Sequence, residues 1–224
     1  MTARQLVDHV EHATNLDLIA VTDHDETAAA AEARAYALGQ GYRVQVIPGV
    51  EVTTRDGHLL ALFIDERPRA LRPLAETAAW VRAHGGLCLV PHPFTRWTHS
   101  LGSRSLRSAA ENGLLSGVEV LNASPAGRAS RTRAVRFADN YGLAAVGGSD
   151  AHMLGLVGLA RTRFHGSTPD DLRRAIELGS TFAEGRFASP GEVAAEAIPQ
   201  LARSMVHLPL RRIARLARER ARRS

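Results

Sequence analysis

Lysine is absent from the 224-residue sequence, so arginine supplies all 28 basic side chains. The net charge of +5 and the pI of about 10.5 therefore reflect coding preference as readily as a nucleic-acid partner. Seven arginines fall between Arg211 and Arg223, where the positive charge is concentrated. This asymmetry indicates a basic tail and argues against a basic fold.

Cysteine occurs once, as Cys88, which excludes an internal disulfide framework. The apolar run Leu87 to Val90 around it predicts a buried and unreactive thiol. Long apolar runs are also missing, and the segment Met1 to Val10 is too polar for a secretory signal. We therefore expect a soluble, cytoplasmic protein without a transmembrane segment.

Short aliphatic runs alternate with alanine- and arginine-rich stretches of helical period, which predicts repeated β–α units. The expected strands are residues 16–22, 44–54, 59–64, 87–91, 118–121, 144–147 and 159–164. The expected helices are residues 3–14, 28–39, 73–84, 103–112, 130–141 and 168–178. Such alternation favours an α/β fold with parallel strands, either an open sheet or a barrel.

Two breaks in this pattern define its limits. Asp56-Gly57 separates two strand-like runs and predicts one antiparallel hairpin. From Ser189 onward prolines divide the chain into short pieces. We therefore place a core domain at residues 1–185 and an arginine-rich, partly helical extension at residues 186–224.

Histidines and carboxylates collect where the predicted strands end, which is the edge at which barrels and α/β sheets hold their active sites. Asp150 and His152 are two residues apart, so their side chains point the same way on an extended backbone. Asp23 and Asp25 flank His24 and could orient it or hold a neighbouring group. Mixed imidazole and carboxylate donors suit zinc, iron or manganese better than magnesium or calcium. The candidates are His24, Glu51, His58, His92, Glu119, Asn122, Asp150 and His152.

Each candidate has a structural alternative. A single histidine at a strand end is more often a hydrogen-bonding group than a ligand, and Glu119 could fill a barrel or lie on the surface. A two-residue turn at Asp56-Gly57 would pair Arg55 with His58 and leave Glu51 about 13 Å further along the strand. A shared cluster therefore requires a wider loop or a bent strand. Four other histidines are expected to be solvated or structural: His84, His99, His165 and His207.

The combination of motifs resembles the polymerase and histidinol phosphatase (PHP) family of metal-dependent phosphoesterases. The sequence from Leu18 to Asp25 is similar to the second motif of that family. Gly49 to Glu51, followed by Gly57 to Leu60, is similar to the third. Pro91 to Phe94 and Gly148 to His152 are similar to the two later motifs, and the match extends from about Leu6 to Gly185.

The resemblance implies a distorted (β/α)7 barrel that carries up to three divalent metal ions, such as Mn, Zn or Fe. Family members open with a strand ending in a His-x-His pair, which this sequence lacks, since His9 and His12 are three apart in a predicted helix. We therefore expect a barrel missing or open at its first strand and holding fewer metals. Either translation starts upstream or the member is degenerate. The ligands carried over are His24, Glu51, His58, His92, Asp150 and His152, with Glu51 as the bridge.

The predicted activity is hydrolysis of a phosphate ester by a metal-activated hydroxide. The substrate could be a nucleotide, an oligonucleotide or a small phosphorylated metabolite. His24 or His152 could protonate the leaving oxygen, and Arg96, followed by Arg128, is the candidate clamp for the phosphate. The alternative is a catalytically impaired PHP-like module that binds a ligand or a partner protein.

The tail supports a separate hypothesis. Ile213 and Leu216 alternate with arginines at helical spacing, a pattern that could contact anionic lipid or nucleic acid. Packing against the core or a solvated end would explain the same pattern.

Overall fold

The computed structural model describes residues 1–95 and 98–195, and the chain divides into a unit Met1–Phe187 and a second unit Ala188–Ser224. Most of the second unit lies outside the described residues, so the predicted boundary near Gly185 and the amphipathic tail stay predictions. The strands of the first unit are β1 (Leu18–Val21), β2 (Gln45–Thr53), β3 (His58–Leu62), β4 (Leu87–Val90), β5 (Gly117–Asn122), β6 (Ala144–Gly148), β7 (Ala160–Arg163) and β8 (Phe182–Gly185). Its helices are α1 (Ala3–Ala13), α2 (Ala28–Gln40), α3 (Leu74–Ala83), α4 (Ser103–Glu111), α5 (Pro125–Tyr141) and α6 (Pro169–Glu177), with a short 3-10 turn, η1 (Leu154–Leu156).

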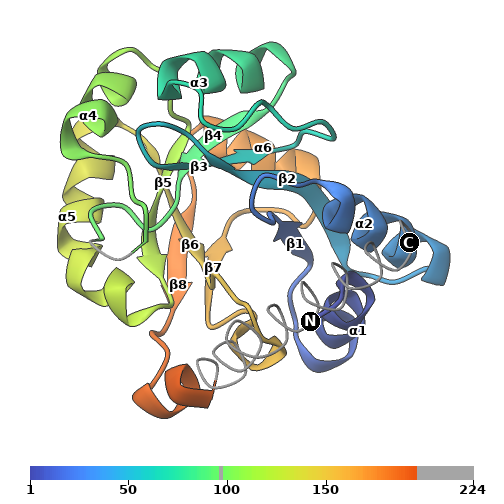
Figure 1. Cartoon of the computed structure of the whole chain (residues 1–224). Coiled ribbons are helices and arrows are strands. Elements are labelled where there is room, and N and C mark those ends of the chain that lie inside the picture. Colours follow the sequence, from blue (N-terminus) through green and yellow to red (C-terminus); the bar gives the residue numbers. More distant parts are fainter. Residues whose placement is uncertain (96–97, 196–224) are drawn as a thin grey trace, which may run out of the picture. The chain divides into compact units, whose positions relative to one another are not determined.

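Six strands form one curled sheet in the order β1-β2-β3-β4-β5-β6 (Figure 1). The pairs β1–β2, β4–β5 and β5–β6 are parallel, whereas β3 runs antiparallel to both of its neighbours. β7 and β8 form a separate antiparallel pair, tied to β6 where the Thr162 hydroxyl donates to the carbonyl of Gly147. β1 pairs only with β2 among the described residues, so it is an edge of the sheet.

Side chains on the sheet alternate between an outer face covered by helices and an inner, concave face. On β2, Val50 and Val52 pack outward, whereas Ile47 packs inward with strand residues from across the curl. Glu51 is four residues from Ile47 and therefore shares the inner face. The inner face is apolar near the starts of the parallel strands and carries ionisable groups at their ends.

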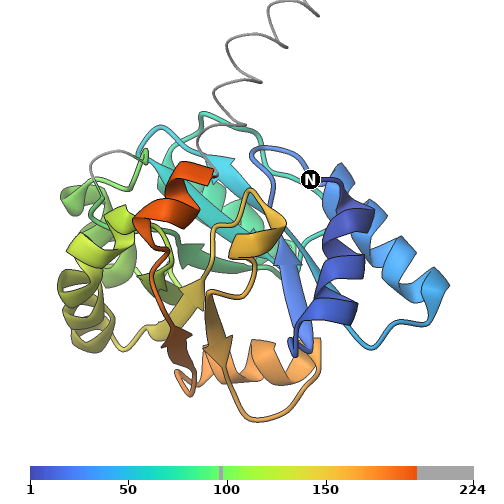
Figure 2. The ribbon, with the colours of Figure 1, turned by 90° about the horizontal axis from the view of Figure 1, so that it is seen from below.

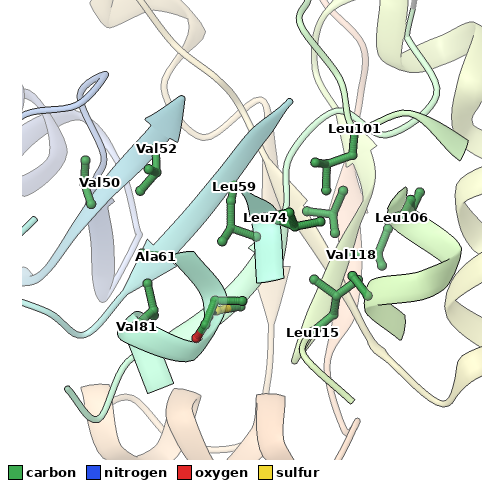
Figure 3. Packing of buried hydrophobic residues seen from close by; sticks show 14 of the residues in the cluster. Val50, Val52, Leu59, Ala61, Leu74, Val81, Leu101, Leu106, Leu115 and Val118 are labelled. Atoms are coloured by element: carbon green, nitrogen blue, oxygen red, sulfur yellow. Dashed lines mark hydrogen bonds between the residues drawn. The ribbon is translucent and has the colours of Figure 1, made fainter. Parts of the chain in front are cut away.

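The outer face is the larger hydrophobic core. Buried side chains from β2 to β5 pack against α3, α4 and α5, as Figure 3 shows for Leu59, Leu74, Leu106 and Val118. Each fully buried aliphatic side chain of this kind stabilises the fold by roughly 1.5–3 kcal/mol. This packing makes the outer face a rigid support for the residues on the inner one.

Helix α6 closes the opposite end of the inner face. Leu172 and Ile176 pack against inward residues of β2, β3, β4 and β6, and Figure 2 shows α6 lying across the end at which β1 begins. The helix starts at a capping box, in which Thr168 accepts from the Asp171 amide and Asp171 accepts from the Thr168 amide. The inner space is therefore filled with apolar side chains at one end and is polar at the other.

The coarse prediction of an α/β fold with a curled, incomplete barrel is confirmed, but seven successive β–α units are not what the described residues form. β2 leads directly to β3 without a helix, as the hairpin at Asp56-Gly57 predicts. Helix α5 begins at Pro125, five residues earlier than predicted, and β8 was not predicted. Cys88 is buried, as expected. None of the described helices combines the length and apolarity that crossing a lipid bilayer requires.

Candidate metal centre

Glu51 is the buried carboxylate at the centre of the candidate site. Its partner in the β2–β3 ladder is Leu60, and Thr53 pairs with His58. The connection is therefore four residues wide, closed by hydrogen bonds from Thr54 to the carbonyl of Gly57. A two-residue turn would have separated Glu51 from His58, whereas this register makes them diagonal neighbours on one face.

Three imidazoles surround this carboxylate. His58 Nδ1 lies 2.9 Å and His92 Nε2 lies 3.0 Å from Glu51 Oε1, and His24 Nε2 lies 3.6 Å from Oε2. Glu51 and His92 are buried, at 6% and 3% exposure, whereas His24 is exposed. The cluster thus has a buried floor and an open rim.

The arrangement of these side chains suits coordination of a metal ion better than it suits hydrogen bonding among the side chains themselves. Ligand atoms of His24, Glu51 and His58 all lie within 4.8 Å of one another. His58 Nδ1 is buried and has no hydrogen-bond partner among the described residues, because its short contact with Glu51 lacks hydrogen-bond geometry. A buried polar atom without a partner costs about 1–3 kcal/mol. A divalent ion between these groups would remove that cost, and nitrogen and carboxylate donors together suit zinc, iron or manganese.

Strained backbone positions mark the strand ends that carry the donors. Asp25, His92 and Asp150 have φ values of 52°, 31° and 50°, a region that non-glycine residues rarely occupy. Asp25 follows His24, and its carboxylate accepts a hydrogen bond from the Thr53 amide at 2.8 Å. Asp25 therefore joins the residue that follows His24 to β2, a contact of the second predicted kind, in which the carboxylate holds a neighbouring group.

Hydroxyl groups hold His92 in its strained position. Thr95 and Ser100 both donate to its carbonyl oxygen, at 2.9 and 2.7 Å. Thr98 Oγ1 lies 3.0 Å from Nδ1 of the ring. On the other side of the ring, Nε2–H donates to Glu51 Oε1 at 3.0 Å, since a lone pair there would face another acceptor.

Glu119 links His92 to the end of β6. Its Oε2 accepts from the His92 amide at 2.6 Å and from Asn122 Nδ2 at 2.9 Å. Asn122 Nδ2 also lies 3.4 Å from Asp150 Oδ2. Gly148 leaves room for this carboxylate, since a Cβ there would fall 2.2 Å from Glu119 Oε1. Glu119, which lies on β5, therefore contacts the residues at the ends of β4, β5 and β6.

The electrostatics follow from burial and from the imidazoles. Burial raises the pKa of Glu51, but the contacts from His58 and His92 and the charges of His92 and His24 outweigh it and lower the pKa to about 2. Burial lowers the pKa of His92, but Glu51 outweighs it, and the pKa is raised. Burial is the main reason that the pKa of Glu119 is raised to about 7, against the opposing hydrogen bonds from His92 and Asn122. Glu51 is thus a permanent negative charge in the site.

The structure brings four predicted ligands directly together: His24, Glu51, His58 and His92. Asp150 joins them through Asn122 and Glu119. His152 is exposed, and its Nδ1 lies 3.0 Å from the carbonyl of Asp150. Arg96 lies outside the described residues. The guanidinium of Arg128 lies over the ring of Phe187, 5.0 Å from its centre.

His99 was expected to be solvated or structural, and the sequence did not connect it with the cluster. Its side chain is exposed, but its ring contacts that of His58, with 5.0 Å between the ring centres. The only sequence signal was its place seven residues after His92. Glu119 was considered as a barrel-filling carboxylate, and it is buried on the inner face.

Sequence comparisons match parts of the chain to known proteins. Residues 128–181 match the PHP-associated family (PHP_C). The uncharacterized proteins MJ1587 and MJ0417 of Methanocaldococcus jannaschii are 33% and 34% identical over 48% and 56% of this chain. The chain covers 59% and 55% of their lengths, so it spans little more than half of the curated relatives it matches.

Solved structures share the fold at low sequence identity. A two-domain protein from Bacteroides vulgatus, containing a predicted PHP-like metal-dependent phosphoesterase, is 18% identical, with a TM-score of 0.67 over 83% of this chain and 61% of that chain. PsfC from Pseudomonas syringae is 21% identical, with a TM-score of 0.64 over 89% and 88%. An amidohydrolase from Chromobacterium violaceum is 18% identical, with a TM-score of 0.56 over 81% and 92%.

The fold and the cluster of imidazoles around Glu51 define a class of α/β proteins with a candidate divalent-metal site at the strand ends. The PHP-associated sequence of residues 128–181 and the fold shared with a solved PHP-like protein make the chain similar to PHP-domain proteins in both sequence and structure. Because one fold serves several hydrolytic chemistries, the substrate has to be argued from the site.

Proposed function

We propose that this protein is a metal-dependent phosphoesterase, whose reaction takes place at the cluster around Glu51. The observation that carries the proposal is the convergence of His24, Glu51 and His58 around a buried nitrogen without a hydrogen-bond partner. In clusters that serve only a structural role, a buried polar atom such as His58 Nδ1 seldom lacks a hydrogen-bond partner. The name of the Bacteroides vulgatus protein supports the same chemistry.

His24, Glu51 and His58 would hold the first ion, and we propose His92, Asp150 and His152 as ligands of further ions, up to three in all. Manganese, zinc and iron are the proposed metals. When bound, such ions lower the pKa of a coordinated water and neutralise charge on phosphoryl oxygens. Glu51 has two oxygens directed at different imidazoles, which suits it to bridge two ions.

The protein's own residues would hold the site in a fixed geometry and donate a proton to the leaving group. Glu119 and the hydroxyls around His92 fix the floor of the site before substrate arrives, so little reorganisation is needed during the reaction. The exposed His24 and His152 are the proposed donors of a proton to the leaving oxygen. Arg96 is retained as the proposed clamp of the phosphate.

The proposed substrate is a nucleotide, an oligonucleotide or a small phosphorylated metabolite. A PHP-like module that binds without turnover is the second candidate. It is favoured by the small number of donors, since one group of three meets the spacing of a metal site among the described residues.

Turnover of a generic phosphate ester separates the two candidates. Purified protein would be loaded with Mn²⁺ and assayed with p-nitrophenyl phosphate and its bis ester, beside Asp150→Ala and Asp170→Ala. Asp170 is a matched control because it lies on α6, at the other end of the inner face. Release of nitrophenol that Asp150→Ala abolishes and Asp170→Ala retains supports the enzyme, whereas bound metal without turnover supports the binding module.

A further inference from the structure

The segment that carries His99 is fixed to the loop between β2 and β3. The His58 amide donates to the carbonyl of His99 at 2.9 Å, and the Gly102 amide donates to that of Asp56 at 3.3 Å. A Cβ at Gly57 would fall 2.5 Å from the Leu101 amide nitrogen, so the two backbones are in direct contact. The backbone of His99 is thus held beside His58 independently of its side chain.

The ring of His99 completes a set of imidazoles around His58. The ring centres of His24, His99 and His92 lie 4.8, 5.0 and 5.6 Å from that of His58, with planes at 60° to 70°. Two imidazoles that bind one zinc ion at about 2.0–2.1 Å have ring centres roughly 5 Å apart. His24, a member of the three-residue donor group, and His99 therefore lie at nearly the same separation from His58.

An exposed histidine on a loop usually turns its ring into water. His99 is exposed, yet its ring is held edge-on against a histidine that is mostly buried. Its ring nitrogens are not part of the group formed by His24, Glu51 and His58, whose ligand atoms lie within 4.8 Å of one another. Because the side chain is exposed, rotation about its own torsions can bring a nitrogen to the rim without moving the backbone.

We propose that His99 is an additional imidazole ligand of this metal centre, an inference that rests on the proposed function. With His99 the centre presents four imidazoles, His24, His58, His92 and His99, around the carboxylate of Glu51. A donor set this rich in nitrogen selects borderline ions such as zinc, cobalt and iron over magnesium and calcium. His99 adds an exposed imidazole beside His58, whereas Glu51 and His92 are buried.

Binding of Zn²⁺ and Co²⁺ to the whole chain tests this inference without an activity assay. Calorimetry would give the Kd for Zn²⁺, and the visible spectrum would report the ligands of bound Co²⁺, for the wild type, His99→Ala, His99→Gln and His58→Ala. His84→Ala is the matched control, since His84 stacks on Trp80 and precedes β4, at the other end of that strand from His92. Loss of a ligand should raise the Kd at least about tenfold.

The expected result is weaker binding and an altered Co²⁺ spectrum in both His99 variants, with neither change in His84→Ala. If His58→Ala loses binding while the His99 variants match the wild type, the inference is overturned and the proposed centre stands. If the wild type binds neither ion, the proposed function fails together with it. An equal loss in His84→Ala and His99→Ala also overturns the inference. Melting temperatures without metal should agree for the wild type, the two His99 variants and His84→Ala, because the side chains of His84 and His99 are exposed.

Discussion

At the scale of single residues, Glu51 organises the site because three imidazoles approach its carboxylate from different segments. The sequence identified these residues individually, since each lies at or near an end of a predicted strand. It could not establish that they meet, because the turn at Asp56-Gly57 favoured a register that separates two of them. The hydrogen bonds of Thr54 to Gly57 close the wider loop, and the backbone of Gly57 lies directly against that of Leu101, a residue distant in the sequence.

Replacing Glu51 by glutamine keeps the shape of the side chain and removes its charge. We expect Glu51→Gln to raise the Kd for Zn²⁺ or Mn²⁺ at least about tenfold, because an amide oxygen is a far weaker ligand than a carboxylate. Calorimetric titration against the wild type measures the change. An unchanged Kd would show that the ion binds elsewhere.

Replacing Gly148 is predicted to destabilise the folded protein for a steric reason. In Gly148→Ala the new methyl group would fall 2.2 Å from Glu119 Oε1, so we expect about 1–3 kcal/mol of destabilisation by urea unfolding. Gly155→Ala is the control, since its Cβ would meet no atom within 4 Å. Equal stability of the two variants would contradict the packing described around Glu119.

Cys88 is predicted to be inert in the folded protein. Burial raises the pKa of its thiol to about 12, despite the opposing charge of Arg82, and the thiolate is the reactive form. Iodoacetamide at pH 8 should therefore label Cys88 only after the chain is unfolded in guanidinium, as mass spectrometry would show. Rapid labelling of the native protein would disprove this burial.

At the scale of elements, local signals predicted the helices better than the strand pairs. The helix expected at residues 168–178 forms as α6 and starts at the capping box of Thr168 and Asp171. Helix α5 was predicted to start late, although Ser124 caps it and Pro125 opens it, because Gly127 weakens the helical pattern. That glycine is required, since a Cβ would fall 2.4 Å from the carbonyl oxygen of Asn122. β8 pairs only with β7 among the described strands, and such non-local pairing has no local signal.

The capping box of α6 predicts a pH dependence of stability. Hydrogen bonds from Thr168 and Ser167 lower the pKa of Asp171 below its ordinary value. Its contribution is therefore present above the unfolded-state pKa and is lost as the pH falls through the lower, folded-state pKa. Urea unfolding between pH 7 and pH 2 should show Asp171→Asn to be less stable at neutral pH, with the difference from the wild type shrinking in acid. Asp170→Asn is the control, because it leaves the capping box of Thr168 and Asp171 intact. Identical stability profiles for Asp171→Asn and the wild type would contradict the prediction.

At the scale of the whole molecule, the α/β class was predictable from the order of strands and helices, and the resemblance to PHP proteins implied an incomplete barrel. The position of α6 across one end of the inner face and the contacts of Glu119 were not predictable, because each joins segments far apart in the sequence. The consequence is that the site depends on the complete first unit. A metal held by residues from β1 to β4 should therefore stabilise the fold as a whole.

The central claim is that imidazoles and a carboxylate from separate strands hold a divalent metal ion between them. Anomalous diffraction from crystals soaked with Zn²⁺ or Mn²⁺, measured at the absorption edge of the metal, tests it most directly. The account predicts a peak bounded by His24, Glu51 and His58 that is absent from crystals of His58→Ala. Crystals with no anomalous peak among these residues, despite metal in the soak, would contradict it.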